Sequence, residues 1–254
     1  FKWRYSRYKN TSTTYCSCPC PDIHTFEFGP TGELYLGCDG GIYKSNDGGT
    51  HWENKSNGLG ITQYYKLGSN GSKIIAGSQD NGSSFVSIDT LDAEKLIWKN
   101  ISGGDCGECA IKNNQWFSSI NTGISNEGRL YKSQIDASGN VTQTTIFSQT
   151  NSTVISTEYP EFIYPIAFQD ENTIYVGYEN IYKTTDGGAT WSNKTSNWHN
   201  NSRTIINIKI APSDNDWIYA LEKNNYLWLS KNGGTTWSQV NIPSNLLFNS
   251  TGQA

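Results

Sequence analysis

The stretch IYKSNDGGTHW, residues 42–52, recurs with small changes as IYKTTDGGATW at 181–191 and as LWLSKNGGTTW at 227–237. Each copy has a Ser or Thr, an Asp or Asn two positions later, a Gly pair and a closing Trp. We predict that the Asp accepts hydrogen bonds from its own turn, that the second Gly takes positive φ and that the Trp packs between sheets. These positions are Ser45, Asp47, Gly49 and Trp52; Thr184, Asp186, Gly188 and Trp191; Ser230, Asn232, Gly234 and Trp237.

The spacing of the copies predicts the number of repeats. Asp47 and Asp186 are 139 positions apart, and Asn232 follows after a further 46. Three steps of about 46 fit the longer interval, and two degenerate copies lie within it, at 84–98 and 130–147. Four short strands in a period of about 40–50 residues are typical of a β-propeller blade. We therefore predict an all-β chain of about five four-stranded blades with the repeated turn between the third and fourth strands, at approximately 22–60, 61–104, 105–150, 160–200 and 203–245.

Residues 1–21 are expected to form an N-terminal strand and a Cys-rich linker. The segment FKWRYSRY alternates like a strand and precedes the first blade. It fits the outer strand of a preceding blade, which we favour, or a strand that closes the ring against the last blade. The chain starts at Phe1 and contains no Met, so we expect a processed form or a segment of a larger propeller.

Composition favours an exported protein. Only 17% of residues are charged and the net charge is -4, which argues against nucleic-acid binding because that requires a basic surface. There is no apolar run approaching the roughly 20 residues of a membrane helix. Six Cys in an Asn-, Ser- and Thr-rich chain indicate disulfides and a secreted or cell-surface location. Glycosylation sequons occur, for instance, at Asn10, Asn54, Asn151 and Asn193.

The cysteines predict disulfides rather than a zinc site. Their spacing is too tight at the N-terminus for an ordinary zinc knuckle. Cys38 is expected to pair with Cys18 or Cys20, and a small loop closed by Cys106 and Cys109 is a further expectation. The six candidates are Cys16, Cys18, Cys20, Cys38, Cys106 and Cys109.

Acidic residues recur on one predicted face. In a propeller the loops between blades and the turns between second and third strands share a face, which we call the top face. Its expected binding residues are Asp22, His24, Asp39, Gln79, Asp80 and Asp105, with Asn126, Glu127, Glu179 and Asn180 in further turns. Three interpretations stay open: ordinary tight turns, a hard-cation site such as calcium formed by Asp22, Asp39, Asp80 and Asp105, and paired catalytic carboxylates.

Aromatic residues occur both in the predicted strands and in the predicted loops. Most are expected to pack between blades, as with Tyr64, Tyr65 and Trp116. A few near loops, such as Trp198, could instead stack on sugar rings.

The repeated turn resembles the Asp-box, or BNR repeat, of the sialidase, xyloglucanase-like and sortilin-like propellers. Residues 184–191 match every fixed position of that motif. CDGGIYKS, residues 38–45, resembles a turn of family 74 glycoside hydrolases in which the Asp is catalytic. That resemblance implies catalysis by Asp39 with a second acid from Asp80 or Asp105. The sialidase Arg-Ile-Pro signature is absent. Residues 22–110 resemble secreted multi-repeat surface proteins of Bacteroidetes-like bacteria, which implies export and extracellular recognition.

The predicted function is an exported binding or adhesion module that recognises a glycan or an extracellular protein through the top face. It requires no cofactor, although calcium is one expected occupant. The alternatives are a xyloglucanase-like glycoside hydrolase fragment and a structural subunit of a surface assembly. Expected partners include further blades or domains of the same parent protein, and exclude nucleic acid and a transmembrane segment.

Overall fold

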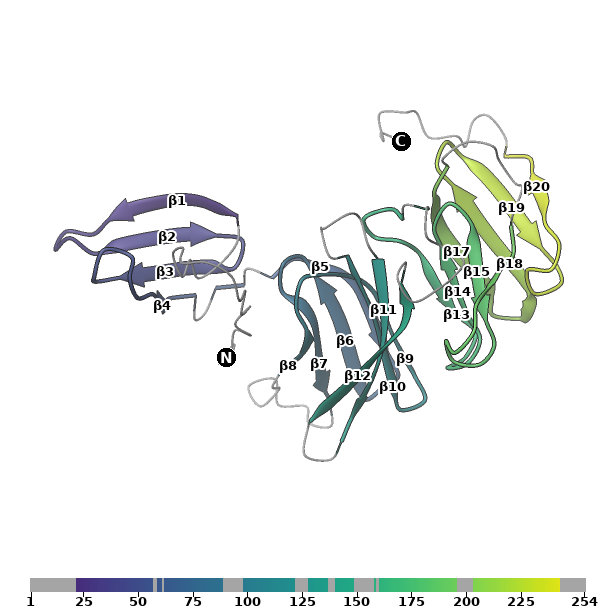
Figure 1. The fold of residues 1–254 in the computed structure, drawn as a ribbon, viewed down its shortest axis with the longest axis horizontal. Coiled ribbons are helices and arrows are strands. Elements are labelled where there is room, and N and C mark those ends of the chain that lie inside the picture. The colour runs from purple at the N-terminus through teal and green to yellow at the C-terminus, as the bar shows by residue number, and fades with distance from the viewer. Residues whose placement is uncertain are drawn as a thin grey trace.

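The computed structural model describes residues 22–56, 59–60, 62–88, 98–121, 128–136, 140–148, 158, 160–195 and 203–242. These residues form five four-stranded antiparallel sheets and contain no helix (Figure 1). The all-β fold with four-stranded, propeller-type blades is therefore confirmed. Each sheet pairs its strands in sequence order, so every connection within a sheet joins neighbouring strands.

The first sheet contains β1 (Ile23–Phe28), β2 (Leu34–Cys38), β3 (Gly41–Ser45) and β4 (Glu53–Asn54). The second contains β5 (Tyr64–Ser69), β6 (Lys73–Ser78), β7 (Gly82–Ser87) and β8 (Lys99–Ser102). The third contains β9 (Asp105–Lys112), β10 (Gln115–Asn121), β11 (Gly128–Ile135) and β12 (Val141–Ser148). The fourth contains β13 (Ile166–Phe168), β14 (Ile174–Gly177), β15 (Ile181–Thr184) and β16 (Ser192–Asn193). The fifth contains β17 (Ile205–Ala211), β18 (Asp214–Glu222), β19 (Tyr226–Ser230) and β20 (Ser238–Val240).

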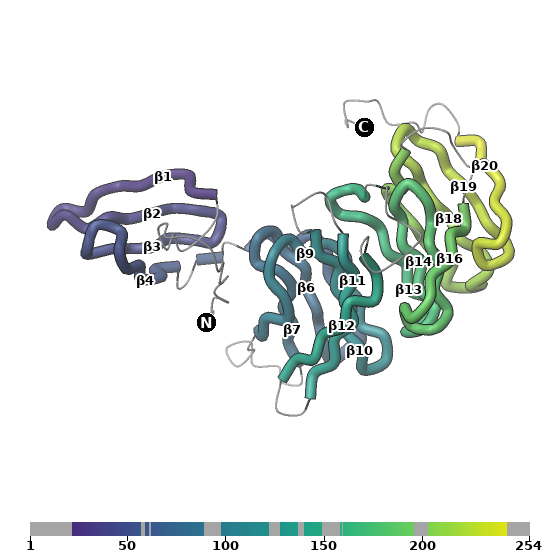
Figure 2. Tube along the Cα trace, viewed as in Figure 1, coloured from purple at the N-terminus to yellow at the C-terminus, as the bar shows by residue number. Residues whose placement is uncertain are grey.

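Apolar cores lie between successive sheets. Ile75 and Phe85 of the second sheet pack with Trp116 of the third. Further cores join the third sheet to the fourth and the fourth to the fifth. The first sheet has a smaller cluster of its own, around Leu36 and Tyr43. The tube view shows the first and fifth sheets at opposite ends of the molecule (Figure 2). These two sheets therefore do not meet within one copy of the chain.

The contact between the third and fourth sheets is rich in aromatic rings. Phe147 is 1% exposed, and its ring centroid lies 4.6 Å from that of Trp191 and 5.3 Å from that of Tyr178. Trp191 also donates from Nε1 to the carbonyl of Ile146 at 2.7 Å. The Trp that closes the second repeated turn therefore ties the fourth sheet to the preceding one.

The second repeated turn is held by hydrogen bonds that converge on two side chains. The Thr184 hydroxyl accepts from the Gly188 N–H at 3.0 Å and donates to Asp186 at 2.7 Å. Asp186 also accepts from the N–H and the hydroxyl of Thr190, at 2.9 and 2.6 Å. These bonds, led by the Thr190 hydroxyl, lower the pKa of Asp186 to about 2. Gly188 takes a φ of +95°, which its lack of a Cβ allows.

The other two turns repeat this geometry with different side chains. His51 replaces the Thr in the first turn, and its ring Nδ1 lies 2.5 Å from an Asp47 carboxylate oxygen. In the third turn Asn232 accepts from the Thr236 N–H at 2.8 Å and donates its amide to the Thr236 hydroxyl at 2.8 Å. A neutral amide thus occupies the place of the carboxylate, but its bond with the Thr hydroxyl runs in the opposite direction, so the turn can form with either side chain.

No helix suited to crossing a membrane occurs among the described residues.

Candidate functional site

Three consecutive sheets contribute carboxylates to one point on the top face. Asp39 lies in the turn between β2 and β3, and Asp80 in the turn between β6 and β7. Asp105 begins β9. Because the turn between second and third strands and the loop that enters the next blade share one end of a blade, these residues meet although they are far apart in sequence.

Asp39 has polar neighbours on several sides, and Asp80 is one of them. The ring Nε2 of His24 contacts its Oδ1, and Gln79 Nε2 donates to its Oδ2 at 3.5 Å. The hydrogen bond from His24 is the main reason that the pKa of Asp39 lies below its usual range. Asp39 is therefore an ionised acceptor at neutral pH.

The pKa of Asp80 is shifted in the opposite direction from that of Asp39. Its N–H donates to Asp105 Oδ1 at 3.0 Å. Its own Oδ2 is buried and has no hydrogen-bond partner among the described residues. Burial, followed by the neighbouring Asp39 and Asp105, raises the pKa of Asp80 to about 6. The backbone φ of Asp80 is +56°, a conformation that costs energy in a residue with a Cβ.

Asp22 completes the acidic cluster, which we define as Asp22, Asp39, Asp80 and Asp105. One carboxylate oxygen from each of Asp22, Asp39 and Asp80 lies within 4.8 Å of the other two. The structure thus brings together all six binding residues predicted for the top face, with His24 and Gln79 as hydrogen-bond partners of Asp39.

The turn that holds Asp80 is fixed by the following strands. Gly82 N–H donates to the Gly104 carbonyl at 2.6 Å, and Asn81 forms an isolated bridge with Gly104. The Ser78 hydroxyl donates to the Gly82 carbonyl at 3.0 Å. These bonds anchor the turn to the segment that leads into Asp105.

Two aromatic residues beside the cluster were not predicted as site residues. Burial, and then the charges of Asp105, Asp80 and Asp39, raise the pKa of Tyr65. The Tyr65 ring makes an edge contact with Phe162, whose side chain is 50% exposed. The sequence indicated Tyr65 only as a packing residue, because its position at the start of a strand does not show which loop it approaches.

The remaining top-face candidates do not join the cluster. Asn126, Glu127 and Trp198 lie outside the described residues. Asn180 instead binds Glu158, donating from its N–H at 3.0 Å and from its amide at 2.6 Å. Tyr182 donates its hydroxyl to the same carboxylate at 2.5 Å, which, together with burial, raises the pKa of Tyr182. Glu158 is a structural anchor that the sequence analysis missed.

The expected disulfide between Cys106 and Cys109 is wrong: both are buried free thiols. Their sulfurs are 3.5 Å apart, whereas a disulfide bond is about 2.05 Å long. A bulge in β9, opposite residues 118–120 of β10, brings both side chains to the same face of the sheet. The hydrogen bond with Cys106 and burial raise the pKa of Cys109, which keeps it protonated. Cys38 is disulfide-bonded, as expected. Cys16, Cys18 and Cys20 lie outside the described residues, so the identity of its partner stays a prediction.

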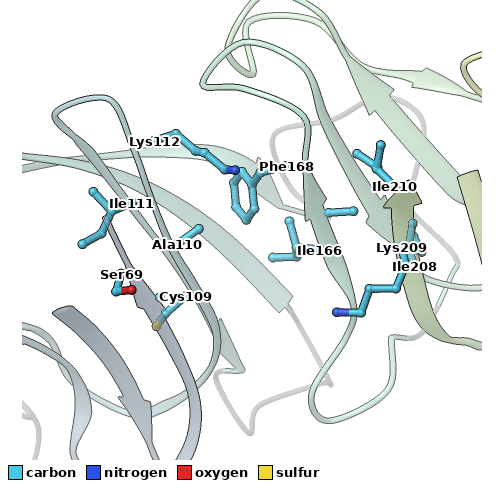
Figure 3. Close-up of a pocket in the computed structure, with 12 residues that line it drawn as sticks. Ser69, Cys109, Ala110, Ile111, Lys112, Ile166, Phe168, Ile208, Lys209 and Ile210 are labelled. Atoms are coloured by element: carbon cyan, nitrogen blue, oxygen red, sulfur yellow. The ribbon is translucent and has the colours of Figure 1, made fainter. Parts of the chain in front are cut away.

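A cavity of about 320 Å³ lies elsewhere, between the first strands of the second to fifth sheets. Figure 3 shows residues 109–112 of β9 on one side, Ile166 and Phe168 in the middle and residues 208–210 of β17 on the other. Its lining contains Lys112 and Lys209 but no carboxylate. None of the acidic cluster lines this cavity, so the two features are separate.

Replacing Asp80 with Asn is expected to stabilise the protein more at pH 8 than at pH 4. The folded-state pKa of Asp80, about 6, exceeds the ordinary value of 3.8. The folded state therefore binds more protons than the unfolded state in this window, and stability falls as pH rises from about 4 to about 6. Asn removes that loss because it does not titrate. Thermal unfolding of both proteins at the two pH values measures the difference.

Asp186→Asn is the matched control for this titration. Its pKa is lowered to about 2, so its contribution is present above pH 4 and is lost only as pH falls further. Its effect should be equal at pH 4 and pH 8. If the stabilisation by Asp80→Asn were no larger at pH 8 than at pH 4, this result would contradict the burial of an ionisable Asp80.

Comparison with known proteins supports the fold. No protein-family model matches the sequence, and no curated protein is recognisably similar to it. The chain is similar in structure to the extracellular domain of the putative one component system BT4673 from B. thetaiotaomicron, with a TM-score of 0.51, 13% identity and coverage of 91% of this chain and 29% of that one. It also matches a Niastella koreensis GH74 enzyme at a TM-score of 0.49 and 14% identity, over 73% of this chain and 31% of that one.

YCF48 bound to D1 peptide is a further match, with a TM-score of 0.46, 14% identity and coverage of 86% of this chain and 67% of that one. The chain spans less than a third of the length of the BT4673 domain and of the GH74 enzyme. At such identities the similarity establishes the fold alone. The class of protein is a β-propeller of four-stranded blades.

Proposed function

We propose that the chain is an extracellular binding module, with Asp boxes at the outer blade edges, that recognises a glycan through the acidic cluster. The observation that carries the proposal is the convergence of carboxylates from three sheets while Asp80 Oδ2 is buried without a partner among the described residues. The Asp39 side chain is 27% exposed, so a bound hydroxyl group can reach its carboxylate.

The surroundings of the cluster fit a sugar. Asp39 is an ionised acceptor for hydroxyl groups, and charge-assisted hydrogen bonds are the stronger kind. The half-exposed ring of Phe162, next to Tyr65, offers an apolar face beside these acceptors. Binding sites commonly combine aromatic surfaces with a few converging polar groups. A cell-surface or secreted location agrees with the extracellular setting of the BT4673 domain.

Calcium is a second proposed occupant of the same cluster. The three carboxylate oxygens within 4.8 Å of one another suit an ion that takes oxygen ligands at about 2.3–2.6 Å. A cation would also compensate the charge of Asp22 and Asp39. Glycan binding that requires calcium and glycan binding that does not are distinguished by adding a chelator.

Binding of the whole chain to a glycan array, followed by titration calorimetry on each hit, tests the proposal. Asp39→Asn and Asp80→Asn should each lower affinity at least about tenfold, which corresponds to about 1.4 kcal/mol. Asp186→Asn, in the outer-edge turn of the fourth sheet, is the control that should leave affinity unchanged. A blank array, or equal affinity of all four proteins, would overturn the glycan assignment.

Glycoside hydrolysis is the alternative function, and one observation favours it. The pKa of Asp39 is lowered while that of Asp80 is raised to about 6, the pattern of a base paired with an acid. Release of sugar product from polysaccharide that is abolished by Asp39→Asn would establish this alternative.

A further inference from the structure

The cavity between the first strands of the sheets is lined by two lysines, one on each side. Lys112 ends β9 and is partly buried, whereas Lys209 lies within β17 and is exposed. Both side chains extend toward the middle of the cavity (Figure 3). Neither ammonium group forms an ion pair or a hydrogen bond with another residue in the part of the chain that the structure describes. The cavity therefore contains two positive charges without a counter-charge from the described residues.

The carboxylates nearest in the fold do not neutralise these lysines. Asp105, of the acidic cluster, begins the eight-residue strand that Lys112 ends. At about 3.3 Å per residue the two positions are roughly 23 Å apart, well beyond the Debye length of about 8 Å at physiological ionic strength. Glu108, which directly precedes the lining residues of β9, pairs instead with Lys66 of β5 at 3.4 Å. An anion that enters the cavity therefore meets uncompensated positive charge.

The space between the two lysines is mainly apolar. Ile166 and Phe168 of β13 lie in the middle of the cavity (Figure 3). The strands that line it, β5, β9, β13 and β17, are each an edge strand of their sheet. An edge strand presents backbone N–H groups that its own sheet does not pair, and these groups are additional donors for an anion. The cavity thus combines positive charge on two sides with apolar side chains between them.

We propose that this cavity binds a small dicarboxylate, with one carboxylate at Lys112, the other at Lys209 and an apolar middle against Ile166 and Phe168. The volume of about 320 Å³ lies at the lower end of the range of about 300–1,000 Å³ that is usual for ligand pockets, so the ligand is a small molecule. Charge-assisted hydrogen bonds to both ends fix its orientation. The site is separate from the acidic cluster, so the proposal does not depend on glycan binding there.

Titration calorimetry of the whole chain with linear dicarboxylates of increasing length tests the site. The homologue whose length matches the separation of the two ammonium groups should bind best, and shorter and longer homologues should bind more weakly. The monocarboxylate of the best length lacks one charge-assisted contact and should bind at least about tenfold more weakly. Equal affinity for the two compounds, or no saturable binding of any homologue at about 1 mM, would overturn the proposal.

Substitution of each lysine locates the binding site. Lys112→Gln and Lys209→Gln should each lower affinity for the best dicarboxylate at least about tenfold. Lys99→Gln is the matched control, because it changes the net charge equally at an exposed position of β8 outside the cavity. Asp39→Asn, at the acidic cluster, should also leave this affinity unchanged, which distinguishes the two sites. If Lys99→Gln weakened binding as much as Lys112→Gln, the attraction would be a general effect of charge and the assignment to the cavity would be wrong.

Discussion

Replacing Gly82 with Ala is expected to lower the free energy of unfolding by about 3–4 kcal/mol, among the largest effects of a single substitution in this chain. Gly82 has a φ of +67°, and a Cβ there would lie 1.9 Å from the Ser102 carbonyl oxygen. The neighbouring strand cannot move away easily, because Ser83 pairs with Ser102 and Gly82 donates to Gly104. Chemical denaturation with a linear extrapolation measures the loss.

Gly71→Ala separates the clash from the backbone conformation. Gly71 has a φ of +97°, but a Cβ at this position would have no atom within 4 Å, so only the left-handed strain applies, about 1–2 kcal/mol. Gly82→Ala should also abolish ligand binding at the acidic cluster, because the turn that it distorts holds Asp80. Equal losses in the two variants would show that the close approach to Ser102 does not persist in solution.

Replacing Phe147 with Ala is expected to cost about 3–5 kcal/mol, the range for deleting a buried aromatic ring. The ring is 1% exposed and touches Tyr178, Tyr182 and Trp191 across the contact between the third and fourth sheets. Its loss leaves a cavity that rings on both sides cannot fill without leaving their own contacts. Thermal unfolding of the variant should show a lowered midpoint.

The exposed Phe28 supplies the matched control for Phe147. It is the same residue type at 79% exposure, so Phe28→Ala should change stability by no more than about 0.5 kcal/mol. A Phe147→Ala variant as stable as Phe28→Ala would contradict the packing of the third sheet against the fourth.

The fold was predictable because its repeated turn is a local feature. The side chains of the Ser or Thr and of the Asp or Asn in each copy bond within the turn itself, so the pattern is visible in the sequence, and the spacing of the copies predicts five four-stranded units. The convergence of Asp39, Asp80 and Asp105 was predictable for a related reason. Turns at equivalent positions of successive blades must share a face, whatever the residues between them.

Contacts between sheets could not be predicted in the same way. Glu158 binds Asn180 and Tyr182 from a position more than twenty residues earlier, and no local pattern connects them. The thiols of Cys106 and Cys109 share a side only because of a one-residue bulge. The exposure of Phe26 could not be predicted either, because the sequence around it is that of an ordinary inner strand. Each of these three features depends on how one segment of the chain is placed against another.

The amide of Asn232 in the third turn has an evolutionary consequence. Asp186 accepts from the Thr190 hydroxyl, whereas Asn232 donates to the Thr236 hydroxyl, so the hairpin forms with either side chain and an exchange between them changes the surface charge of the protein. Three such positions line the outer edge of different blades. An exchange of Asp for Asn at such a turn therefore lowers the negative charge of the surface and removes the stabilisation that the ionised carboxylate provides, so solubility and stability are coupled at these positions.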